Sequence, residues 1–203
     1  DYDRAVSLLG RLQKKYPKDP VLYQLAGEVY LFGFRRGREA AGYLLEALRL
    51  CGQDENMECF RGSLYLLGRC RLFLGEEEEA RRCFKEYITA CRGEDGCSRR
   101  YEEFYGERGR RKYRIGCAWF FLGRWEEAKQ CFREMHTQDC RCDGCVRTCC
   151  YEMLLAEAMV LLAQGEVSLA AEKYNMAAEQ VPDDMEHRFE ADQLWEKIRE
   201  ESS

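Results

Sequence analysis

Proline is almost absent from this chain of 203 residues, and the places where it occurs are informative. The three prolines are Pro17, Pro20 and Pro182. The long stretch from residue 21 to residue 181 therefore contains no residue that would interrupt a helix by removing a backbone donor. Composition alone thus permits a largely helical fold.

The chain also lacks the features that several functional classes require. No apolar run approaches the roughly 18 residues that a membrane-spanning helix needs. Histidine occurs only at His136 and His187, and no nucleophile elbow, phosphate-binding loop or metalloprotease helix is found, so we predict that the protein is not an enzyme. The net charge of −5 argues against a nucleic-acid partner, and the basic cluster at residues 108–114 is balanced by glutamates just before it.

Cysteine, by contrast, is abundant, with 13 residues in the chain. Disulfide frameworks are typical of short secreted proteins, whereas a chain of this length buries a core that needs no such cross-links. The odd count also leaves at least one thiol unpaired. We therefore predict reduced thiols and a cytoplasmic location.

The clearest structural pattern lies at residues 122–132, which read Leu-Gly-Arg-Trp-Glu-Glu-Ala-Lys-Gln-Cys-Phe. Gly123 allows the backbone to leave an apolar helix. We expect Trp125 to fill the wedge between this helix and the next, Ala128 to permit close approach, and Phe132 to lie one turn further along the same face. The pattern predicts an antiparallel helical hairpin.

Similar layouts recur along the chain. Complete hairpins are predicted at residues 20–52, 61–93, 109–141 and 151–183. Residues 1–19 read as the second half of a truncated hairpin, and residues 184–203 as an amphipathic helix that caps the end of the stack. Because the first half of the first hairpin is missing, we expect the chain to be part of a longer protein.

This hairpin, with its turn glycine, aromatic residues, alanines and closing proline, resembles the tetratricopeptide repeat. The last hairpin carries the pattern at Gly165, Ala170, Tyr174, Ala177 and Pro182. The resemblance implies an all-α fold, a right-handed α-α superhelix that forms a single domain over residues 1–203. The repeats are degenerate. The family's period is about 34 residues, whereas the turn glycines of the last three hairpins, Gly75, Gly123 and Gly165, are 48 and 42 positions apart.

The resemblance also implies a function, a scaffold for protein–protein interaction. The first helices of the hairpins would line a concave groove that holds a peptide or a partner helix. The positions that would face it are Gln24, Glu28, Tyr65, Arg69, Arg110, Tyr113, Arg114, Cys117, Leu155 and Met159. The tyrosines and arginines of this set suit an acidic or aromatic peptide. The alternative is that the tyrosines pack between helices and the arginines are solvated, so that neither binds a ligand.

A second hypothesis rests on the cysteines between residues 140 and 150. Cys142-Asp-Gly-Cys145 has the two-residue spacing and the glycine that let two thiolates turn onto one metal ion. Cys149, with Cys140, Cys150 or His136, would complete a tetrahedral zinc site. Structural zinc sites generally join two separated pairs, whereas here every candidate falls within one short segment. A redox pair, or thiols with no ligand, are therefore alternatives, and the interaction scaffold itself needs no cofactor.

A third hypothesis is that the chain is the sensor or regulatory domain of a signalling protein or transcription regulator. Helical repeats of this length also bind small effectors, and the sequence names no partner that would decide between these roles.

Overall fold

The computed structural model describes residues 2–52, 57–91, 107–135, 148–179 and 185–201. All regular secondary structure within these ranges is helical, so the all-α prediction is confirmed. The elements are α1 (Tyr2–Lys15), α2 (Pro20–Glu28), the π-helix η1 (Val29–Gly33), α3 (Gly37–Leu50), α4 (Met57–Phe73), α5 (Glu77–Cys91), α6 (Glu107–Phe121), α7 (Trp125–Met135), α8 (Thr148–Ala163), α9 (Val167–Ala178) and α10 (Met185–Glu201).

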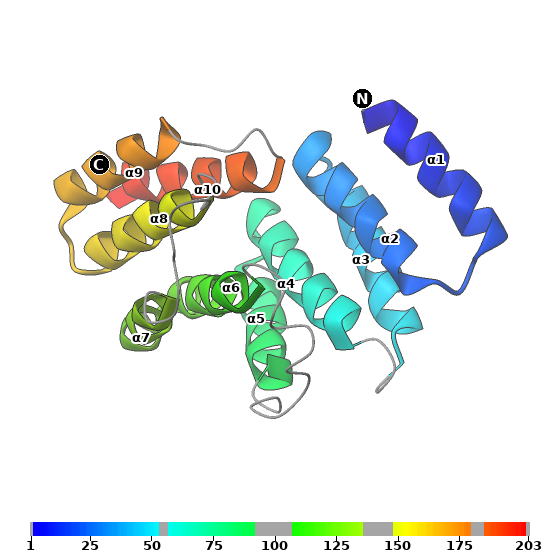
Figure 1. The fold of residues 1–203 in the computed structure, drawn as a ribbon, viewed down its shortest axis with the longest axis horizontal. Coiled ribbons are helices and arrows are strands. Elements are labelled where there is room, and N and C mark those ends of the chain that lie inside the picture. Colours follow the sequence, from blue (N-terminus) through cyan, green and yellow to red (C-terminus); the bar gives the residue numbers. More distant parts are fainter. Residues whose placement is uncertain (1, 53–56, 92–106, 136–147, 180–184, 202–203) are drawn as a thin grey trace. The chain divides into compact units, whose positions relative to one another are not determined.

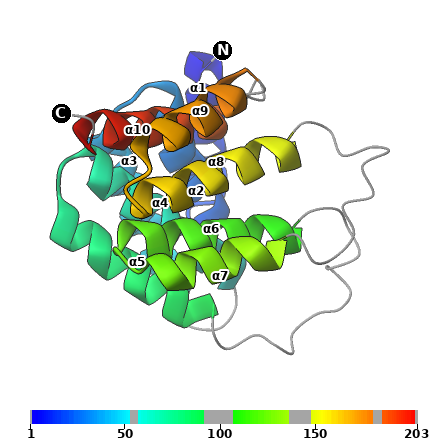
Figure 2. The ribbon, with the colours of Figure 1, turned by 90° about the vertical axis from the view of Figure 1, so that its left-hand side faces the viewer.

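The chain divides into two compact units, which are described separately: unit 1 is Asp1–Asp95 and unit 2 is Gly96–Ser203. In unit 1, α2 pairs with α3 and α4 pairs with α5, while α1 lies against α2 (Figure 1). In unit 2, α6 pairs with α7 and α8 pairs with α9, and α10 lies against both α9 and α8 (Figure 2). The single domain over residues 1–203 stays a prediction.

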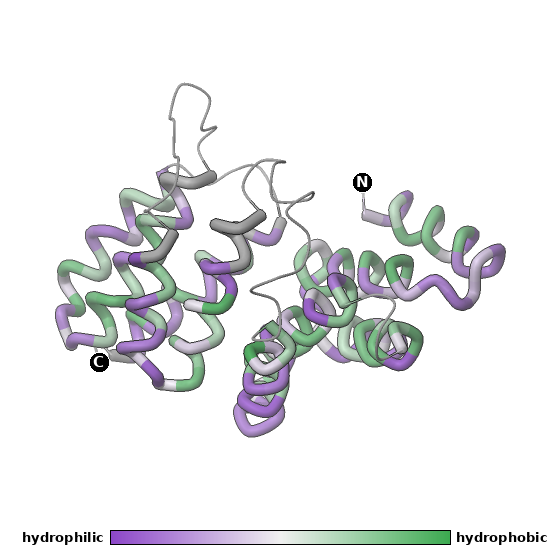
Figure 3. Tube along the Cα trace, turned by 60° about the horizontal axis from the view of Figure 1, so that its bottom comes forward, coloured by the Kyte–Doolittle hydropathy of each residue, from purple (hydrophilic) through white to green (hydrophobic). Residues whose placement is uncertain are grey.

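Longer first helices account for part of the spacing between hairpins. Helix α4 begins at Met57 and α8 begins at Thr148, each a few residues before the start expected from the pattern. They have 17 and 16 residues. Hydrophobic and hydrophilic stretches alternate along the helices of both units (Figure 3), as expected where one face of each helix is buried.

Three hairpins turn at a glycine in the left-handed backbone region. Gly75, Gly123 and Gly165 have φ values of 74°, 73° and 78°. In each case the amide of the next residue donates to a carbonyl five residues back, as Glu76 does to Arg71 at 2.9 Å. This is a standard helix C-terminus, and glycine adopts it without a Cβ penalty.

The hairpin formed by α2 and α3 turns differently. The π-helix η1 precedes this turn, and the left-handed position is held by Arg35, with φ 57°. The amide of Arg36 then donates to the carbonyl of Tyr30, six residues back, at 2.9 Å. The two glycines near this turn, Gly33 and Gly37, permit close packing against Tyr2 and Leu74.

Small residues bring the two helices of each hairpin together. A Cβ atom at Gly68 would lie 2.6 Å from the Phe84 ring, and one at Gly116 would overlap the Phe132 ring. Ala128 and Phe132 are buried, as the pattern predicts. The prediction for Trp125 is wrong: its ring centroid lies 5.2 Å from that of Phe120, but the side chain is 42% exposed, because it packs at the turn end of the hairpin, where α7 begins, and not between the two helices.

Candidate interaction groove

The predicted groove residues of unit 1 fall into two groups. Gln24 and Glu28 are half-buried on α2, where the Gln24 amide donates to the Glu28 carboxylate at 3.0 Å. Tyr65 and Arg69 on α4 are only 1% and 2% exposed. Arg69 Nη1 donates to the Tyr65 hydroxyl at 2.9 Å, and the Tyr65 ring packs near Phe84. The Tyr65 side chain therefore packs between α4 and α5, and neither Tyr65 nor Arg69 presents a surface to a ligand.

In unit 2 the corresponding positions are also buried. Tyr113, Cys117, Leu155 and Met159 are at most 1% exposed, and Cys117 Sγ lies 3.9 Å from Met159 Sδ. Arg110 belongs to the first turn of α6, and its side chain lies outside the described part of the chain.

Helix α10 contacts this surface of unit 2 directly. The Tyr113 hydroxyl donates to Glu190 Oε2 at 3.4 Å. The Arg114 guanidinium pairs with the Glu186 carboxylate at 2.5 Å. The sequence predicted that the last helix has one apolar face, but only the structure shows which positions it contacts. A partner could reach Tyr113 and its neighbours only if α10 moved.

Most of the proposed zinc ligands lie outside the part of the chain that the structure describes. Cys140, Cys142 and Cys145 lie outside the described residues, and Cys149 is described only as part of the first turn of α8. In the described ranges, no three His, Cys, Asp or Glu side chains are placed to hold a metal ion. The zinc site stays a prediction.

The buried cysteines of unit 1 behave as small apolar side chains. Burial raises the pKa of the Cys70 thiol to about 11 and that of Cys59 to about 12, so both are protonated at neutral pH. The Cys70 thiol donates to the Gly37 carbonyl at 2.9 Å. Because the thiolate is the reactive form, these two residues are poor candidates for a redox site.

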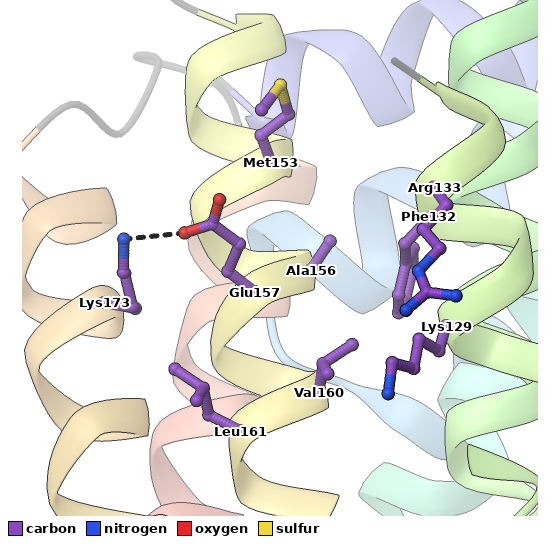
Figure 4. Close-up of a pocket in the computed structure, with 9 residues that line it drawn as sticks. All are labelled: Lys129, Phe132, Arg133, Met153, Ala156, Glu157, Val160, Leu161 and Lys173. Carbon is purple, nitrogen blue, oxygen red and sulfur yellow. Dashed lines mark ion pairs between the residues drawn. The ribbon is translucent and has the colours of Figure 1, made fainter. Parts of the chain in front are cut away.

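Unit 2 contains a pocket of about 410 Å³ on the side of α8 that faces α7 (Figure 4). Its lining comes from α7, α8 and α9 and consists of Lys129, Phe132, Arg133, Met153, Ala156, Glu157, Val160, Leu161 and Lys173. Apolar side chains make up most of the wall, and its volume lies within the roughly 300–1,000 Å³ of typical ligand sites. We call this feature the α7–α9 groove.

The charges of the α7–α9 groove are unevenly distributed along its rim. Lys173 on α9 pairs with Glu157 on α8 at 2.7 Å, and this hydrogen bond raises the pKa of the lysine (Figure 4). Lys129 and Arg133, one turn apart on α7, form no ion pair within the described part of the chain. The α7 side of the groove therefore carries two available positive charges.

Sequence reasoning did not single out this groove, because a lysine and an arginine on a helix are typical of a solvated face. One signal was present. Helix α8 is apolar around most of its circumference, with Leu, Met, Ala or Val at most positions from Met153 to Ala163. A helix of that kind is normally buried on every side, yet Met153, Val160 and Leu161 are only half-buried here.

The described helices define a helical-repeat protein built from antiparallel hairpins. Residues 63–91, which comprise most of α4 and all of α5, match the family model of the tetratricopeptide repeat. The sequence-based prediction of a tetratricopeptide-type repeat protein is thereby confirmed. No curated protein matches the chain. None of the helices in the described ranges is both long and apolar enough to cross a membrane.

Proposed function

We propose that this chain is a protein-binding module and that unit 2 holds a helix of the partner protein in the α7–α9 groove. Tetratricopeptide repeats generally mediate protein–protein interaction. Their stacked hairpins provide extended surfaces and rigid helices on which a binding site can be built. The groove supplies such a site on described residues.

The observation that carries the proposal is the apolar wall of the groove. Met153, Val160 and Leu161 are half-buried on a helix whose other faces pack against α6, α9 and α10. A partner that covered them would remove further apolar area from water, which contributes about 25 cal/mol per Å². Laying an amphipathic helix in an apolar groove is a recurrent mode of recognition.

Two further observations favour this location and this role. Four of the positions expected to form a concave groove in unit 2 are buried, and α10 contacts Tyr113 and the half-buried Arg114. Among the residues that the structure describes, the lining of the α7–α9 groove contains no serine, threonine, cysteine or histidine. These facts support binding in preference to nucleophilic catalysis there.

Selection from a displayed library of helical peptides tests the proposal. Peptides retained by the full chain are expected to lose about tenfold or more in affinity for Val160→Gln, because a polar amide replaces apolar wall. The matched control is Leu169→Gln, since Leu169 is exposed on α9 and does not line the groove. The control should bind as the native chain does.

Two outcomes would contradict the proposal. One is that the selected peptides bind Val160→Gln as tightly as the native chain. The other is that no peptide is retained while a small apolar dye binds in the groove and is lost in the same variant. That second outcome would favour the sensor hypothesis, in which the ligand is a small effector.

A further inference from the structure

We infer that the segment held in the α7–α9 groove is an acidic amphipathic helix, with its apolar side against α8 and its carboxylates toward α7. This inference rests on the proposed function, and it adds the chemical class of the partner. Three features of the groove carry it: its length, the spacing of its cations and the neutral character of its opposite rim.

The groove is elongated along α8. Its lining residues on that helix lie between Met153 and Leu161, which are eight positions or about 12 Å apart along the helix axis. Met153, Ala156 and Val160 recur three or four positions apart, and Leu161 follows directly after Val160. A row of this kind matches the apolar stripe of another helix, whose side chains recur with the same spacing.

The cations on α7 have the same period. Lys129 and Arg133 are four residues apart and therefore lie about 6 Å apart along the helix axis. Acidic residues at positions i and i+4 of a partner helix would face both of them at once. Figure 4 shows both side chains extending from α7 beside the Phe132 ring.

The other rim does not compete for the same charge. Glu157 and Lys173 neutralise one another across α8 and α9. On α7 itself, Glu127 pairs with Arg124 at the start of the helix, away from the groove. The chain as a whole has a net charge of −5, so general attraction would not bring an acidic peptide here. Any preference for acid must arise from the local cations.

The test uses two synthetic peptides of about 16 residues, roughly 24 Å of helix, with the same leucine stripe. One carries glutamates at positions i and i+4 beside the stripe, and the other carries lysines there. Binding of each labelled peptide to the full chain is measured by fluorescence anisotropy. We expect the acidic peptide to bind about tenfold or more tightly than the basic one in low salt, and this ratio to shrink as added salt screens the charges.

Charge reversal on the protein sharpens the test. The double variant Lys129→Glu with Arg133→Glu should reverse the preference, so that the basic peptide binds more tightly. Lys85→Glu is the control, because Lys85 is exposed on α5 of unit 1 and lies outside the groove. It should leave the ratio of the two affinities unchanged.

Equal binding of both peptides by the native chain, lost in Val160→Gln, would overturn the acidic partner and leave the groove as a binding site. Binding of neither peptide, with no effect of Val160→Gln on library-selected peptides, would overturn the proposed function as well.

Discussion

Two interfaces between successive hairpins, one in each unit, have equivalent places in the repeat but different structures. In unit 1, α3 packs closely on α4, so that Ala41, Leu44, Leu66 and Cys70 are all buried. In unit 2, α7 leaves a pocket of about 410 Å³ beside α8. The difference follows from the side chains. Where α3 has Ala41, α7 has Lys129, and where α4 has Leu66, α8 has Ala156.

This comparison shows how one repeat scaffold forms both closed and open interfaces between hairpins. Small residues on one helix and large apolar residues on the next close an interface, because close packing at high density leaves no room for a ligand. Long cationic side chains opposite small residues leave the interface open, since the charged groups remain in water. Exchanging residues between equivalent positions should therefore convert part of one interface into the other.

The largest effect is expected when the cation of α7 is placed in the closed interface. Ala41 is 6% exposed, and Ala41→Lys would bury an unpaired charge at a cost of about 3 kcal/mol or more. Circular dichroism during urea unfolding measures the loss. The reverse exchange, Lys129→Ala, should change the free energy of unfolding by about 0.5 kcal/mol or less. Equal losses would show that the two interfaces do not differ in this way.

The second exchange concerns the large residue of α4. Leu66→Ala should lower the free energy of unfolding by about 2–5 kcal/mol, because it leaves a cavity in a closed interface. Ala156→Leu should lower the free energy of unfolding by about 1 kcal/mol or less, since the added side chain can extend into the groove.

All three tryptophans, Trp119, Trp125 and Trp195, lie in unit 2. Tryptophan fluorescence therefore follows unit 2, whereas circular dichroism follows both units. A large loss in Ala156→Leu would show that the groove cannot accept the side chain.

The third exchange compares two glycines that face aromatic rings. In Gly68→Ala the new methyl group would collide with the fully buried ring of Phe84, at a cost of about 1–3 kcal/mol. In Gly116→Ala the ring of Phe132 borders the groove and has space to turn into it, so the loss should be smaller. The same movement would narrow the groove and weaken peptide binding. Thermal unfolding and peptide anisotropy give the two readings, and equal losses at both positions would argue against a free space beside Phe132.

The smallest effect concerns the turns within the hairpins. Arg35 occupies the left-handed position that glycine occupies in the other three complete hairpins. Arg35→Gly should therefore raise the free energy of unfolding by about 1 kcal/mol, whereas Gly75→Ala should lower it by a similar amount. Urea unfolding followed by circular dichroism compares the two. No gain in Arg35→Gly would indicate that contacts of the arginine side chain offset the backbone strain.

Much of the fold was predictable because its determinants are local. A turn glycine, an alanine five residues later and a ring four residues beyond it define three of the four complete hairpins within a short segment. Gly123, Ala128 and Phe132 have the geometry that the pattern predicts. The wedge role of Trp125 was wrong, because the pattern gives spacing but not whether the end of a hairpin is covered. The groove was not predicted, since its cations lie on a helix face that reads as solvated.

The sequence by itself determined the helices, their pairing into hairpins and the glycine turns, because each depends on residues within about one repeat of one another. Tertiary structure alone decided which faces are covered. Tyr113 meets Glu190 across 77 positions of the chain, and the α7–α9 groove opens between two hairpins and not within one. Contacts over such distances depend on how neighbouring helices fill the space between them, and no local spacing of residues specifies that volume.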